Sequence, residues 1–89
     1  MITADSLKQS AKLFEAKLNK AAKNNKEAEE LLLQVKLLIG EAKQVTSITD
    51  FKFRRLRFGH VFLEGQLGND ISLFNAYATF ANQFEGLGV

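Results

Sequence analysis

The chain has 89 residues, of which 46% are hydrophobic and 25% are charged, and its formal net charge is +2. This composition is typical of a globular domain and excludes the low hydrophobicity of disordered chains. The sequence has no cysteine, which excludes disulfides and thiolate chemistry, and its single histidine argues against a zinc site, so we expect neither a cofactor nor a metal.

The N-terminal residues carry no basic region followed by an apolar stretch, and the apolar runs are only a few residues long. The sequence therefore predicts no signal peptide and no transmembrane segment. We expect a cytoplasmic protein that does not bind membranes, because its lysine-rich helical segment has few bulky apolar residues. Its length predicts a single domain over residues 1–89.

The first half of the chain carries a heptad repeat. Eleven positions, all apolar except one asparagine, follow alternating steps of four and three. They are Leu7, Ala11, Phe14, Leu18, Ala21, Asn25, Ala28, Leu32, Val35, Ile39 and Ala42. Further leucines widen this stripe, so we expect its second part to be covered on more than one side, as in a bundle core. These are Leu13, Leu31, Leu33, Leu37 and Leu38.

Two structures satisfy the repeat. One is an antiparallel helical hairpin with helices over residues 6–24 and 26–45, and the other is a single long helix in a coiled coil. Local signals favour the hairpin, because Asn24 with Glu27 three residues later resembles a capping box. Lysines close the first segment and glutamates open the second, as the helix dipoles favour.

The stretch over residues 51–67 has no coherent helical face. Phe51 and Phe53, then Leu56 and Phe58 after a one-residue slip, share a face if a bulge lies at Arg54. We therefore predict a β-hairpin here, with a turn around residues 59–60. The alternative is a third helix that begins at Ser47.

The last predicted element is an aromatic-rich helix over residues 70–85. Leu73, Tyr77, Phe80 and Phe84 recur at helical spacing, Asn69 or Asp70 can cap the helix, and Gly86 is placed to end it. The predicted fold class is therefore α+β and mainly helical, with an all-α alternative built on one long coiled-coil helix.

Catalysis is not expected. His60 and Glu64 could form half of an acid–base or metal site, but the sequence offers neither a third ligand nor a nucleophile for it. The serines do not lie in a nucleophile-elbow pattern, and the glycines do not form a phosphate-binding loop. We therefore predict a protein that is not an enzyme and has no small-molecule substrate.

The remaining features favour binding to macromolecules. The predicted function is a protein–protein interaction or assembly module, of the adaptor, chaperone, virion-component or plasmid- or phage-encoded inhibitor type, with a protein partner or a second copy. The alternative is nucleic-acid binding through residues 51–62, where cations and aromatics alternate. The predicted partner-binding residues are Lys52, Arg54, Arg55, Arg57, Leu31, Leu38, Tyr77, Phe80 and Phe84.

Overall fold

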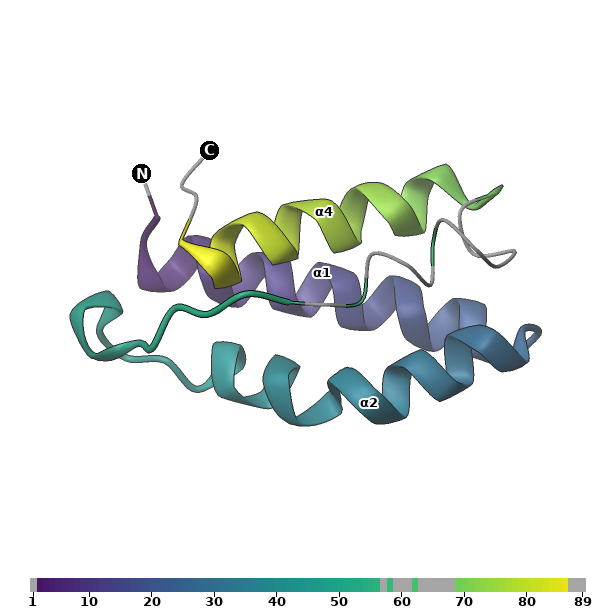
Figure 1. Cartoon of the computed structure of the whole chain (residues 1–89), viewed down its shortest axis with the longest axis horizontal. Helices are drawn as coiled ribbons and strands as arrows, with labels where there is room; N and C mark the ends of the chain where they lie inside the picture. The colour runs from purple at the N-terminus through teal and green to yellow at the C-terminus, as the bar shows by residue number, and fades with distance from the viewer. Residues whose placement is uncertain (1, 57, 59–61, 63–68, 87–89) are drawn as a thin grey trace.

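The computed structural model describes residues 2–56, 58, 62 and 69–86. Within these residues the chain forms three α-helices and one 3-10 turn, which are α1 (Ala4–Ala22), α2 (Lys26–Lys43), η1 (Ile48–Asp50) and α4 (Ile71–Glu85). Helix α1 packs against both α2 and α4, whereas α2 and α4 make few contacts with each other in the described part of the chain (Figure 1). None of the described helices is long and apolar enough to cross a membrane.

The helical hairpin is confirmed, and the single long helix is wrong because α1 ends before α2 begins (Figure 1). A capping box starts α1, in which the Thr3 and Ser6 side chains each accept a hydrogen bond from the other residue's backbone N–H. The cap of α2 is Asn25 rather than the predicted Asn24. The Asn25 side chain accepts hydrogen bonds from the backbone N–H groups of Glu27 at 2.8 Å and Ala28 at 3.4 Å.

The turn between α1 and α2 should tolerate lengthening. We expect insertion of two glycines between Lys23 and Asn24 to change the free energy of unfolding by no more than about 1 kcal/mol, because loop-closure entropy grows slowly with length and Asn25 keeps its capping role. Urea denaturation followed by circular dichroism measures this change. A large loss of helicity would contradict the fold-back.

Aromatic side chains join α1 to α4. The Phe14 ring of α1 lies 5.6 Å from the Tyr77 ring and 5.4 Å from the Phe80 ring of α4, measured between centroids. The Ser6 hydroxyl donates a 2.7 Å hydrogen bond to the Gln83 amide oxygen, so the start of α1 lies beside the end of α4. The two helices therefore run antiparallel, and α4 buries its aromatic face inside the chain itself.

Both ends of α4 follow from local chemistry. The Asp70 carboxylate accepts a hydrogen bond from the Leu73 N–H at 3.1 Å and so caps the helix, as predicted. At the other end Gly86 has a left-handed conformation, with φ of 80°, and its N–H bonds to α4 carbonyl groups. This glycine ends the helix, as the sequence indicated.

The buried stripe follows the predicted seam in both helices, with one departure in α2. In α1 the buried residues include Leu7, Phe14 and Leu18, all predicted seam positions. In α2 the buried leucine is Leu31, and Leu32 is only partly buried. Ala28, Val35, Ile39 and Ala42 are buried as predicted, so the register is kept and only the position between Ala28 and Val35 differs by one residue.

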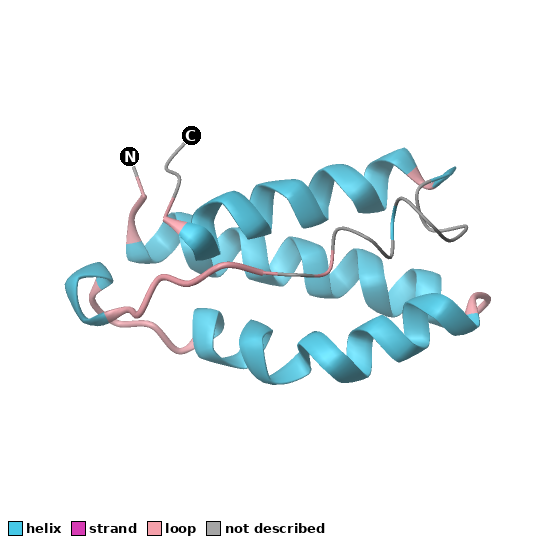
Figure 2. Ribbon diagram, in the orientation of Figure 1, coloured by secondary structure: helices cyan, strands magenta, loops and turns pink. Residues whose placement is uncertain are grey.

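The predicted β-hairpin over residues 51–67 is wrong, and with it the α+β class: the described residues contain no strand (Figure 2). Residues 51–56, which we call the strap, run as irregular chain between α2 and α4 (Figure 1). The third helix from Ser47 is also wrong, because η1 is a single turn and Phe51 is already extended, with φ of −78° and ψ of 131°. Residues 57, 59–61 and 63–68 of the prediction lie outside the described residues.

Candidate functional site

The strap is held to the helices by Arg54. Its backbone N–H donates to the Phe84 carbonyl oxygen at 3.4 Å, and its guanidinium lies 4.7 Å from the centroid of the Phe84 ring. The same guanidinium forms an ion pair with Glu41 of α2 and donates to the Lys52 carbonyl oxygen at 2.9 Å. One side chain therefore links the strap to both helices that flank it.

Apolar contacts also pack the strap against the helices. The Phe51 ring lies 5.3 Å from the Phe84 ring and 5.2 Å from the Phe53 ring, both edge-on. Leu56 is buried, and its backbone N–H donates to the Glu85 carboxylate at 2.9 Å. Backbone N–H groups of the strap are therefore satisfied by the C-terminal end of α4, through the Phe84 carbonyl group and the Glu85 carboxylate, instead of by a second strand.

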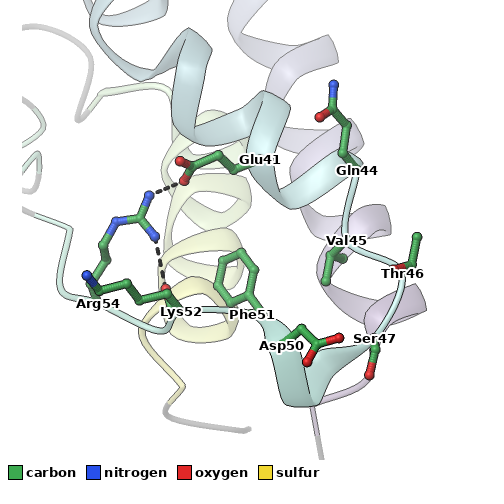
Figure 3. Close-up of a pocket in the computed structure, with 9 residues that line it drawn as sticks. All are labelled: Glu41, Gln44, Val45, Thr46, Ser47, Asp50, Phe51, Lys52 and Arg54. Atoms are coloured by element: carbon green, nitrogen blue, oxygen red, sulfur yellow. Dashed lines mark hydrogen bonds and ion pairs between the residues drawn. The ribbon is translucent and has the colours of Figure 1, made fainter.

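An open pocket of about 620 Å³ lies between the C-terminal end of α2 and the strap. Its lining combines acidic, basic, hydroxyl and apolar groups, contributed by Glu41, Gln44, Val45, Thr46, Ser47, Asp50, Phe51, Lys52 and Arg54. Figure 3 shows the Arg54 guanidinium bridging Glu41 of α2 and the Lys52 carbonyl group of the strap. The guanidinium charge of Arg54 is therefore already engaged by the protein.

Two polar groups of the pocket are engaged by neighbouring residues. Its acid Glu41 is paired with Arg54, and the Ser47 hydroxyl shares a 2.8 Å hydrogen bond with the hydroxyl of Thr49. Among the described residues no three histidine or carboxylate side chains come together as metal ligands. The half-site considered from the sequence, His60 with Glu64, lies outside the described residues. The absence of enzymatic activity stays a prediction.

The structure separates the predicted basic site residues. Lys52 and Arg55 are exposed, and Arg54 is half-buried in its contacts with Glu41 and Phe84. Arg57 lies outside the described residues. The acidic partner that Arg54 takes is Glu41, near the end of α2.

Most of the predicted apolar site residues belong to the protein's own core. Leu31, Phe80 and Phe84 are at most 1% exposed, Tyr77 is buried, and Leu38 is half-buried. Burial raises the pKa of the Tyr77 hydroxyl, a hydrogen bond with the Phe58 backbone lowers it, and the charge of Glu85 raises it further. In the folded chain these residues act by holding α2 and α4 to α1, and their partner-binding role stays a prediction.

The exposed apolar residues lie on another face of α2. Leu33 and Leu37 are 69% and 82% exposed, and they stand on the side opposite the buried residues Leu31, Val35 and Ile39. We call the row that contains them the outer seam of α2, and it consists of Lys26, Glu30, Leu33, Leu37, Gly40 and Gln44. Every residue of the outer seam is exposed except Gly40, which is half-exposed.

From the sequence, Leu33 and Leu37 are expected only to widen the core stripe and to be covered. A signal for a second surface was nevertheless present. The outer seam also follows alternating steps of four and three, with two leucines at its centre. The other positions of this row are charged, polar or glycine, so the apolar seam was predicted to face the core, as it does at Ala28, Val35, Ile39 and Ala42.

Comparison of the chain with protein-family models, with curated proteins and with solved structures finds no match.

Proposed function

We propose that the chain is a small, non-catalytic protein–protein interaction or assembly module that binds its partner through the outer seam of α2. The observation that carries this proposal is the exposure of Leu33 and Leu37 while the rest of the α2 leucine stripe is closed against the core. Side chains four residues apart on a helix are neighbours, so these two leucines form one continuous apolar patch.

The internal structure of the chain does not require leucine at these two positions. Neither side chain is part of the buried cluster that joins the three helices. Lysine, glutamate and glutamine form helices about as well as leucine, so helix propensity does not select leucine there either. An exposed apolar patch with polar neighbours is typical of a docking site.

Nucleic-acid binding through the strap has less support. That function needs several cations free to neutralise phosphates. Arg54 is committed to Glu41 and to the Phe84 ring, which leaves Lys52 and Arg55 as the exposed cations of the strap.

The proposal is tested by affinity capture with the tagged chain from a lysate that also contains untagged chain. We expect proteins, either other chains or the untagged copy, to be retained by the wild type and lost with the double variant Leu33→Gln/Leu37→Gln, because polar side chains remove the apolar patch. Ile71→Gln is the matched control, since Ile71 of α4 is 71% exposed and lies away from the outer seam. Retention that survives the double variant, or that nuclease treatment abolishes, would contradict the proposal.

A further inference from the structure

The spacing of the outer seam of α2 is symmetric about Val35, so the seam can be aligned with a reversed copy of itself. Lys26 and Gln44 lie equally far from Val35 along the helix, as do Glu30 and Gly40, and as do Leu33 and Leu37. An antiparallel copy of α2 centred at the level of Val35 would therefore place leucine against leucine in the middle of the contact.

The residue pairs on either side of the leucines would also fit together in such a contact. A Cβ atom added at Gly40 would meet nothing within 4 Å, so this position leaves open space on the helix surface. In the reversed pairing the long side chain of Glu30 from the other copy falls over this space. The ammonium group of Lys26 then lies beside the amide of Gln44, whose oxygen can accept its hydrogen bond.

From this pattern we infer that the partner of the outer seam is a second copy of this chain, bound as an antiparallel α2–α2 dimer with twofold symmetry. The inference rests on the proposed function and names the occupant of the same surface. A twofold contact is closed, because the same patch is used on both subunits. The small net charge of +2 on each copy opposes the association little.

Like charges within the seam layers disfavour a parallel pairing of the two helices. A parallel dimer would stack Lys26 on Lys26 and Glu30 on Glu30, and such like-charge layers are destabilising. In the antiparallel dimer Glu30 approaches the region of Glu41 on the other copy. Glu41 already pairs with Arg54, so a guanidinium lies beside these carboxylates.

Light scattering on the full chain, from low micromolar concentration to about 1 mM, tests the association. We expect a dimer whose dissociation constant rises at least about 100-fold in Leu33→Gln/Leu37→Gln, because four buried leucines are lost from one contact. Ile71→Gln should dimerise as the wild type does. Circular dichroism confirms that each variant is folded.

The direction is tested with spin labels on single cysteines, which are unambiguous because the chain has no cysteine of its own. In the antiparallel dimer, labels in Gln44→Cys lie about 27 Å apart along the helix axis, at about 1.5 Å per residue. Labels in Gln34→Cys lie at nearly the same level as each other. In a parallel dimer both pairs would lie at the same level.

Three outcomes overturn the inference: a monomer at every concentration, a dimer that the double leucine variant does not weaken, and short distances for both labels. A monomer that nevertheless captures another protein through Leu33 and Leu37 overturns the inference alone and leaves the proposed function standing. A long distance at position 44 with a short one at position 34 supports the antiparallel seam.

Discussion

Replacing Phe14 with alanine is expected to lower the free energy of unfolding by about 3–5 kcal/mol, as is typical when a fully buried aromatic side chain is removed. Phe14 is completely buried, and its ring contacts both the Tyr77 and the Phe80 rings, so the substitution opens a cavity between α1 and α4. For a domain of this size the melting temperature should fall by about 4–8 °C for each kcal/mol lost. Thermal and urea denaturation measure both quantities.

The control is the neighbouring residue on the same helix. Leu13 is 48% exposed, so Leu13→Ala should cost less than about 1 kcal/mol. If the two variants lost similar stability, the orientation of α1 against α4 would be wrong. If neither lost stability, the aromatic contacts would not form the core.

The same substitution at two glycines should have opposite effects. Gly86→Ala is expected to lower the free energy of unfolding by about 1–2 kcal/mol, because residue 86 has a positive φ that alanine adopts at a cost. The new Cβ atom would also lie 3.0–3.3 Å from atoms of the Phe53 side chain. Gly40→Ala is expected to raise it by about 0.5–1 kcal/mol, because glycine is the weaker helix former and a Cβ atom there meets nothing within 4 Å.

Chemical denaturation of the two variants beside the wild type measures the difference, which should reach about 1.5–3 kcal/mol when the two opposite effects are added. Two changes of the same sign would contradict this expectation. Destabilisation by Gly40→Ala below the concentration at which the chain dimerises would mean that a group of the same chain lies against position 40. Stabilisation by Gly86→Ala would mean that the end of α4 does not need the left-handed conformation.

Some features could be predicted because their causes are local. The fold-back between α1 and α2 follows from asparagines in a lysine-rich segment followed by glutamates, since capping and helix dipoles act within one turn. The end of α4 follows from Gly86, which adopts the αL conformation that other residues rarely take. Caps nevertheless shift by a residue, as Asn25 in place of Asn24 shows.

The hydrogen-bond partners of the strap could not be predicted from local sequence signals. Alternation of apolar and charged residues over 51–56 indicated an extended chain with one apolar side, and Phe51 is extended and packed against Phe84. The alternation does not specify what the backbone bonds to. Here the Glu85 carboxylate and the Phe84 carbonyl group take the place of a neighbouring strand, and both come from residues far away in the sequence.

The sequence by itself determined the two paired helices, the aromatic C-terminal helix and most of the buried positions in α1, because helical periodicity and capping depend on residues a few positions apart. Only the tertiary structure decided that Leu31 faces the core and that Leu33 and Leu37 face outward. It also decided that the Arg54 side chain links the strap to α2 and α4 instead of lying free on the surface. The physical reason is that the leucines of α2 extend around most of the helix, and only its packing against α1 decides which of them are covered and which stay on the surface.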